Sequence, residues 1–179
     1  MNVKKLKNAV RIGHFSINLN ESVKKNLNFT KDRNLSTYDY TKNEARVYFI
    51  SVNDEIVKIG GSNAKGGIRG TISPYCSGNG GRPSDRTFGV NYLIEKQLQN
   101  GNRVELYAQW MPSIEAKVPS ITGSAGIMVS FSYKEMEEAC VKEYLKCSCG
   151  IHPKWNFQEA GRPWPSEIQE SRRKLLESK

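Results

Sequence analysis

The sequence predicts an α+β fold, in which helices flank a small and mostly antiparallel central sheet. Two short apolar segments, 47–50 and 56–59, enclose the turn residues 52–55 and indicate a β-hairpin. Apolar residues at helical spacing in 91–99 indicate an amphipathic helix, and an alternating pattern in 103–111 indicates a further strand. The expected order, β-β-α-loop-α-β-β-α, favours a layer of helices packed on an antiparallel sheet.

The segment between the hairpin and the first long helix is expected to hold little regular structure. A short helix over Ile68–Ile72 would be stopped by Pro74, and the glycine-rich residues 76–89 have the composition of a loop. After the strand at 103–111, residues 112–126 are expected to be an exposed excursion before another strand at 127–131.

The C-terminal third is expected to be mainly helical. A helix is predicted over Lys134–Lys146, and residues 150–165 are rich in proline and tryptophan. A short charged helix is predicted for Glu167–Lys179. These boundaries divide the chain into a basic N-terminal arm (1–44), a central domain (45–165) and a charged C-terminal tail (166–179).

The N-terminal arm concentrates the positive charge of the chain. Residues 1–42 contain nine lysines and arginines against three acidic residues, which is +6 of the total net charge of +9. An arm kept only for solubility and an arm that contacts DNA or another protomer both fit this charge. The alternation of Phe15, Ile17 and Leu19 additionally predicts a strand within it.

Composition limits the class of protein. A chain of 179 residues with 37% hydrophobic and 25% charged residues is typical of one soluble globular domain. No apolar run approaches the roughly 20 residues of a membrane span, and the basic N-terminus lacks the apolar core of a signal peptide. The four cysteines form no dense disulfide pattern, so we expect a cytoplasmic protein. The pI of about 9.4 favours a polyanion as partner.

Three side chains around the hairpin have the chemistry to bind an anionic group. Tyr48 and Lys58 are placed on neighbouring strands, and Arg69 follows after the flexible link Gly60–Ser62. An arginine can bind a phosphate through two parallel hydrogen bonds, and a lysine can lower the pKa of a nearby phenol. Taken alone, however, tyrosines and lysines are common in strands, so a structural role is the simpler interpretation.

The two motifs in this hairpin resemble the signature of a nuclease superfamily. Arg46-Val47-Tyr48 and Lys58-Ile59-Gly60 are similar to the paired motifs of the GIY-YIG nucleases, and particularly to those of its small restriction and phage endonucleases. The resemblance covers residues 45–165 and implies a small central sheet flanked by helices. Lys58 stands where many members have a second tyrosine, so Tyr48 is the only phenol in the motif.

The resemblance also implies roles for residues further along the chain. Arg69 matches the catalytic arginine of the family, although the glycine-rich segment before it is about one residue longer than usual. Glu137 matches the metal-binding glutamate, because apolar residues follow at plus three, plus four and plus seven; Glu138 and Glu143 are alternatives. Asn156 matches the asparagine that closes the family motif, after an apparent insertion that includes Cys147 and Cys149.

These matches imply a DNA endonuclease that uses Mg²⁺, with Mn²⁺ as a substitute. Tyr48 would activate water, Lys58 and Arg69 would bind the phosphate, and Glu137 would hold the metal while Asn156 braces the site. Double-stranded DNA is the expected partner, and cutting both strands favours a homodimer or homotetramer. A non-catalytic DNA- or RNA-binding module of the same fold is the alternative.

Two further groups of residues are candidates on chemistry alone. The loop arginines Arg82 and Arg86, together with Lys65, are expected to contact DNA, although a solvated turn would look the same. Four residues could bind zinc by their chemistry: Cys76, Cys147, Cys149 and His152. The Cys-x-Cys pair lacks the spacing of structural zinc sites, so ordinary buried or loop thiols are favoured for the cysteines.

Overall fold

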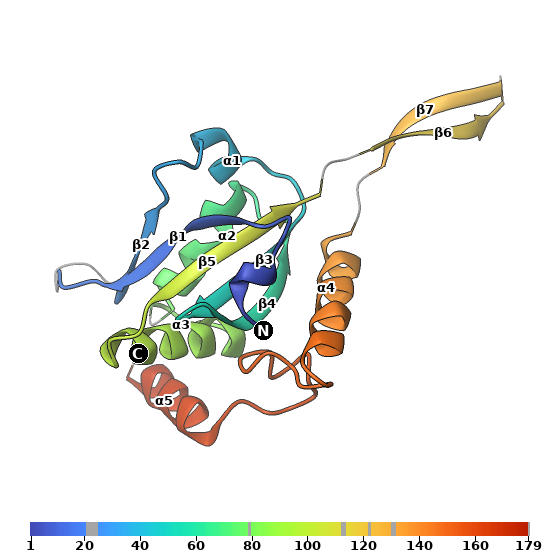
Figure 1. Cartoon of the computed structure of the whole chain (residues 1–179). Helices are drawn as coiled ribbons and strands as arrows, with labels where there is room; N and C mark the ends of the chain where they lie inside the picture. The colour runs from blue at the N-terminus through green and yellow to red at the C-terminus, as the bar shows by residue number, and fades with distance from the viewer. Residues whose placement is uncertain (21–24, 79, 112–113, 122, 130–131, 179) are drawn as a thin grey trace.

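A computed structural model describes residues 1–20, 25–78, 80–111, 114–121, 123–129 and 132–178. Among these residues, five antiparallel strands form one sheet in the order β2-β1-β5-β3-β4 (Figure 1). The α+β fold predicted from the sequence is confirmed. The strands are β1 (Val10–Ile17), β2 (Leu27–Lys31), β3 (Arg46–Val52), β4 (Glu55–Ser62) and β5 (Val104–Trp110).

The hairpin of β3 and β4 closes through the two-residue turn Asn53–Asp54. Both residues have positive φ angles, 47° and 69°, which is the backbone that a tight hairpin turn requires and that Asn and Asp tolerate. Asn53 is further fixed by its amide, whose oxygen accepts a hydrogen bond from the backbone of Arg103. The turn pairs Val52 with Glu55, and a register shift between Ser51 and Ile50 then places Tyr48 opposite Gly60.

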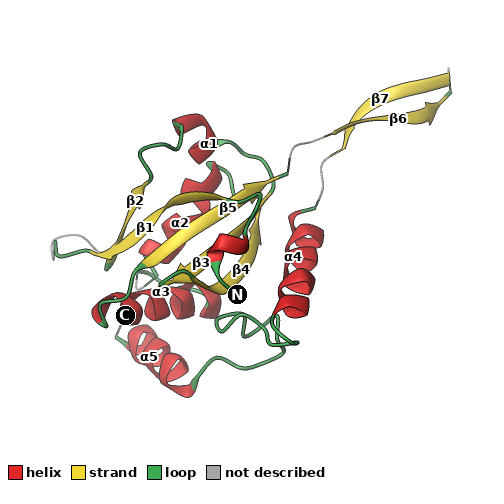
Figure 2. Cartoon of the chain, in the orientation of Figure 1, coloured by secondary structure: helices red, strands yellow, loops and turns green. Residues whose placement is uncertain are grey.

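Two helices cover one face of the sheet, α2 (Gly67–Cys76) and α3 (Asp85–Gln99) (Figure 2). The prediction that Pro74 stops α2 is wrong: the helix continues to Cys76, because Ile72, Tyr75 and Cys76 are buried against the sheet. The predicted loop 76–89 is also too long. The hydroxyl of Ser84 accepts a hydrogen bond from the backbone of Thr87, and this N-cap starts α3 at Asp85.

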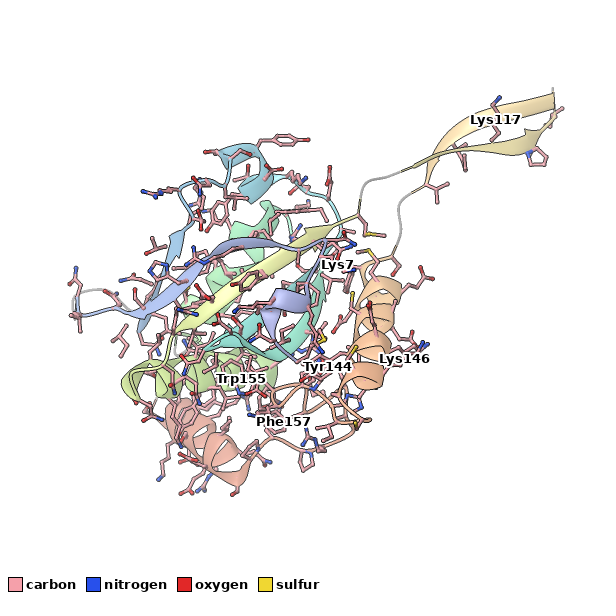
Figure 3. The ribbon with its side chains drawn as sticks, viewed as in Figure 1. Lys7, Lys117, Tyr144, Lys146, Trp155 and Phe157 are labelled. Carbon is pink, nitrogen blue, oxygen red and sulfur yellow. The ribbon has the colours of Figure 1, made fainter. Side chains whose placement is uncertain are left out.

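The opposite face is covered by α4 (Tyr133–Cys147) and by a short 3-10 helix, η1 (Val3–Lys5). Figure 3 shows Tyr144 on the inner side of α4 and Lys146 on its outer side. Met136, Val141 and Tyr144 pack against the apolar residues of β3 and β4 on this face. The helix predicted over 134–146 is confirmed to within one residue at each end.

The predicted N-terminal arm contributes to the central sheet. β1 pairs with β5 on one side and with β2 on the other, and the short helix α1 (Thr37–Thr41) packs near α2. The strand expected around Phe15 is present, and Ile12, Phe15 and Leu27 are buried in the core. Strands β1 and β2 are thus held by the same core as the hairpin, because burying these apolar side chains stabilises the strands there.

A second hairpin, β6 (Ile114–Ser120) and β7 (Gly123–Val129), extends away from the body of the molecule (Figure 1). The expected excursion at 112–126 is therefore partly strand, and the strand expected at 127–131 starts earlier. It pairs with β6 rather than with the central sheet. Residues 112–113, 122 and 130–131 of these two predictions lie outside the described residues.

The chain ends in helix α5 (Ser166–Glu177), which packs near α3 and confirms the predicted C-terminal helix. Trp164, just before it, is buried against Gly89 of α3, where a side chain larger than hydrogen would meet the indole ring. In the part of the chain that the structure describes, no helix combines the length and apolar character needed to cross a membrane.

Candidate active site

Tyr48 and Lys58 lie on the same face of the β3–β4 hairpin. Tyr48 pairs with Gly60, and Lys58 pairs with Ile50, so the two side chains are diagonal neighbours two residues apart along each strand. Both side chains are almost completely buried, with Lys58 only 1% exposed. The structure therefore brings together the first two residues of the predicted site, beneath α2 and α3.

Gly60 makes room for the ring of Tyr48. A Cβ atom at this position would lie 2.4 Å from both Cζ and Oη of Tyr48. The phenol instead reaches across the strand and its oxygen lies 2.6 Å from the hydroxyl oxygen of Tyr75 on α2. The motif glycine is thus required by the closeness of the phenol to the backbone of β4.

Glu137 reaches the same region from α4. Its Oε2 accepts a hydrogen bond of 2.8 Å from the backbone N–H of Gly61, and a Cβ atom on Gly61 would lie 2.7 Å from this oxygen. Of the two alternatives, Glu138 is exposed and paired with Lys142, and Glu143 lines a cavity with Met1 and Cys147. Glu137 is the one of the three that contacts the motif.

Asn156 braces β4 from outside the sheet. It is completely buried; its Oδ1 accepts a hydrogen bond from the N–H of Ile59 at 2.9 Å, and its Nδ2 donates one to the carbonyl of Ile59 at 2.8 Å. The backbone of Trp155 donates to the carbonyl of Val57 at 2.8 Å. Asn156 therefore acts on the site by fixing the strand between Lys58 and Gly60.

One carboxylate oxygen links two cations at this site. Oε1 of Glu159 lies 3.6 Å from Nζ of Lys58 and 3.0 Å from Nη2 of Arg86. Arg86 is the second residue of α3, and its Nε also donates to the side chain of Gln158 at 3.2 Å. The predicted DNA contact Arg86 thus belongs to the cluster around Lys58.

Burial dominates the electrostatics of these groups. It raises the pKa of Tyr48 well above 10, and the nearby phenol of Tyr75 adds to this shift. Burial lowers the pKa of Lys58, against the attraction of Glu159. The pKa of Glu137 is raised, first by burial and also by the charge of Glu159. Each buried group is therefore biased toward its neutral form, and an anion or cation that enters the site would change that balance.

The remaining predicted residues lie outside this cluster. Arg69 is exposed on α2 and lines a separate pocket with Lys25, Tyr40 and Cys76, beside β2. Lys65 and Arg82 are exposed. Among the described residues, no hydrogen bond or ion pair joins Arg69 to Tyr48, Lys58 or Glu137.

The zinc interpretation gains no support from the geometry. Cys76 is buried at the last residue of α2, whereas Cys147 is exposed at the last residue of α4 and Cys149 is exposed two residues beyond it. Within the described residues, no three His, Cys, Asp or Glu side chains gather closely enough to hold a metal ion.

Sequence reasoning missed Tyr75 and Glu159 at this site. Both come from segments far from the hairpin, and neither stands in a motif. The sequence signal that was available for Glu159 is its position three residues after Asn156, in a segment already expected near the site.

Comparison with solved structures finds chains of similar fold. A variant of EndoII from bacteriophage T4 is similar over 86% of this chain and 95% of its own, with a TM-score of 0.51 and 20% sequence identity. The fold is shared with a phage endonuclease. Restriction endonuclease HPY188I, solved with product DNA, covers 86% of this chain and 84% of its own, at a TM-score of 0.48 and 20% identity.

The likeness to EndoII confirms the fold that the GIY-YIG resemblance implies. No protein-family model matches the sequence, and no curated protein matches it by sequence. The roles of the individual residues therefore rest on the geometry of this chain.

Proposed function

We propose that this chain is a DNA endonuclease that hydrolyses phosphodiester bonds. The observation that carries the proposal is the grouping of the buried Tyr48 and Lys58 with the half-buried Glu137 around the two motif glycines, Gly60 and Gly61. A base, a cation and a carboxylate within one site are the groups that phosphodiester hydrolysis needs. The fold shared with the phage endonuclease supports this proposal.

Tyr48 is the proposed general base. Its phenol is neutral in the resting protein, because burial raises its pKa. To act as a base, this phenol first loses its proton to solvent, and the charge of Lys58 beside it stabilises the phenolate. The phenolate then accepts a proton from the attacking water, directly or through a second water, and becomes the neutral phenol again. The hydroxyl of Tyr75 can donate the hydrogen bond between the two phenols, and the oxygen of Tyr48 then accepts it. Lys58 binds a nonbridging oxygen of the phosphate.

Glu137 fits the requirements of a Mg²⁺ ligand. One of its oxygens is held by the N–H of Gly61, and this contact fixes the carboxylate at the rim of the site. Mg²⁺ prefers carboxylate and phosphate oxygens and keeps most of its waters, so one protein carboxylate is a sufficient donor. When bound, Mg²⁺ or its substitute Mn²⁺ stabilises the charge that develops on the leaving oxygen.

Double-stranded DNA is the proposed substrate. The exposed cations Lys65, Arg69 and Arg82 are proposed to bind backbone phosphates, which position the duplex. Arg69 takes this role here because it lies outside the Tyr48 cluster. We further propose that the enzyme cuts at preferred sequences and works as a homodimer or homotetramer, since one site per chain cuts one strand at a time.

The alternative is a binding module without catalysis. The burial of Tyr48 and Lys58 argues against it, because a module that only binds a polyanion has its cations at the surface. Keeping a lysine 1% exposed carries a desolvation cost, which is expected where a reaction uses it.

Plasmid cleavage distinguishes the two. Wild-type protein and Glu137→Ala are incubated with supercoiled DNA in Mg²⁺ and in EDTA. We expect wild type to give discrete linear fragments in Mg²⁺ and intact DNA in EDTA, and Glu137→Ala to cleave at least about 100-fold more slowly. Intact but gel-retarded plasmid with the wild type would favour the binding module. Equal cleavage by Glu137→Ala would refute the assigned role of this residue.

A further inference from the structure

The cationic groups of Arg86 and Lys58 both lie close to one carboxylate oxygen. The same oxygen of Glu159, Oε1, lies 3.0 Å from the guanidinium and 3.6 Å from the ammonium group. A carboxylate oxygen between an arginine and a lysine has the charge and the hydrogen-bonding partners of a nonbridging phosphate oxygen. The position that Glu159 fills is therefore suited to a phosphate.

We propose that Arg86 and Lys58 together bind the scissile phosphate, and that the carboxylate of Glu159 holds this place in the DNA-free protein. The inference rests on the proposed endonuclease function and names the arginine that serves it. It assigns to Arg86 the role that motif order assigns to Arg69.

The supporting elements favour Arg86 over Arg69. Arg86 lies in the first turn of α3, which is fixed by the Ser84 cap, and its charge acts on the pKa of Lys58, Tyr48 and Glu137. Its side chain is 42% exposed, so a phosphate can reach it from solvent. Arg69 is exposed on α2, with its side chain in a pocket beside β2. Arg86 is thus both inside the cluster and accessible.

Access to Lys58 requires Glu159 to move. Lys58 is 1% exposed, and one of the groups that cover its ammonium is the carboxylate of Glu159. Glu159 lies on a turn segment, 157–161, outside the helices and strands, whereas Lys58 and Arg86 are held by β4 and α3. A phosphate that enters would be repelled by this carboxylate, so the carboxylate leaves while the two cations remain.

The test separates rate from affinity. Single-turnover cleavage of a duplex is measured in Mg²⁺ with protein in excess, and binding to the same duplex is measured with Ca²⁺ in place of Mg²⁺. The variants are Arg86→Ala, Arg86→Lys and Arg69→Ala, with Arg173→Ala on α5 as a charge-matched control. For the placeholder, Glu159→Gln is compared with Glu138→Gln, an exposed glutamate of α4.

We expect Arg86→Ala to lower the single-turnover rate at least about 100-fold and to lower the affinity by much less. Arg86→Lys is expected to recover part of the rate, and Arg69→Ala is expected to lose less of it than Arg86→Ala. Glu159→Gln is expected to bind DNA about tenfold more tightly, whereas Glu138→Gln binds as the wild type does. Circular dichroism of each variant checks that it is folded.

The outcomes that overturn the inference differ from those that overturn the function. An active wild type with a folded Arg86→Ala that cleaves within about threefold of it refutes the role of Arg86. Unchanged or weaker DNA binding by Glu159→Gln refutes the proposal that the Glu159 carboxylate occupies the phosphate position in the DNA-free protein. A wild type that binds but never cleaves refutes the proposed function, and the affinities of Arg86→Ala and Glu159→Gln then decide whether this is a phosphate site.

Discussion

The hydroxyl oxygens of Tyr48 and Tyr75 lie 2.6 Å apart in the core, one from β3 and one from α2. Either phenol can donate the hydrogen bond. Lys58 stands where many GIY-YIG nucleases, whose motifs this hairpin resembles, have a second tyrosine, and Tyr75 brings a second phenol to Tyr48 from a helix. The pair ties the packing of α2 to the protonation of the proposed base.

The rate of cleavage should depend on pH through Tyr48. Because burial raises its pKa above the ordinary value of about 10, the fraction of phenolate rises about tenfold per pH unit throughout the neutral range. We expect the single-turnover rate to rise with pH from 6 to about 9 without levelling off, as checked in a series of overlapping buffers.

Two variants control for other titrating groups. Tyr48→Phe should lose this rise together with most of the activity, whereas Tyr38→Phe, at an exposed tyrosine, should keep the wild-type profile. A rate that levels off near neutrality in the wild type would contradict a phenol base.

Gly60→Ala should damage the site directly. The added Cβ would lie 2.4 Å from Cζ and Oη of Tyr48, so the ring must leave its place or β4 must shift. We expect a loss of stability of about 1–3 kcal/mol, measured by urea unfolding, and a loss of cleavage beyond what the fraction unfolded explains. Gly61→Ala should instead act through Glu137 and raise the Mg²⁺ concentration needed for half-maximal rate.

Asn156→Asp should destabilise the protein. The Nδ2 donor to the carbonyl of Ile59 is lost, and a buried carboxylate takes its place. We expect a cost of about 2–4 kcal/mol in urea unfolding at pH 7. The exposed Asn8→Asp is the matched control, and a cost similar to that control would show that Asn156 does not brace β4.

Arg46→Lys should also destabilise, although it keeps the charge. The Arg46 guanidinium is completely buried and donates to Thr71 and to the carbonyls of Glu44, Ala64 and Gly67. A lysine offers fewer donors and no planar fork, so carbonyls at the start of α2 are left unpaired. We expect about 3 kcal/mol in thermal or urea unfolding, against little change for the exposed Arg33→Lys.

Replacing residues 112–131 by a short Gly-Ser linker should leave the body of the protein intact. β6 and β7 pair with each other and extend away from the central sheet (Figure 1). We expect the unfolding temperature to stay within about 4 °C of the wild type. Light scattering on the same samples would show whether the hairpin, with Ile121 fully exposed, contributes to assembly. A large drop in unfolding temperature would contradict its independence.

Local sequence patterns were enough to predict the hairpin and the candidate residues on it. The turn at Asn53–Asp54 and the flanking apolar runs indicate the hairpin, and its pairing, with the register shift beside Ile50, brings Tyr48 near Lys58. Glu137 could be selected because helical spacing places it at the edge of the apolar stripe of α4. In each case the choice of the residue rests on neighbours within a few positions of it in the sequence.

The rest depends on contacts between distant segments. The pairing of β1 with β5 joins residues about 95 apart, and the Glu159 contact joins residue 159 to 58 and 86. The excess of lysine and arginine favoured an N-terminal arm. Net charge does not show which face of a strand is buried, so it could not reveal that this segment joins the central sheet. Likewise, the motif contains Arg46, but the carbonyls of Ala64 and Gly67 that accept its hydrogen bonds lie 18 and 21 residues further along the chain, between β4 and the start of α2.

The outer edge of β4 is closed by groups from elsewhere in the chain. Trp155 covers Val57, Asn156 covers Ile59 and Glu137 covers Gly61. An open edge strand is a template for another chain, and this apolar edge would recruit one. The residues that shape the proposed reaction thus also guard the protein against self-association. A variant that loses Asn156 or Glu137 can fail by aggregating before it fails as a catalyst, so solubility belongs beside activity in any mutational study of this site.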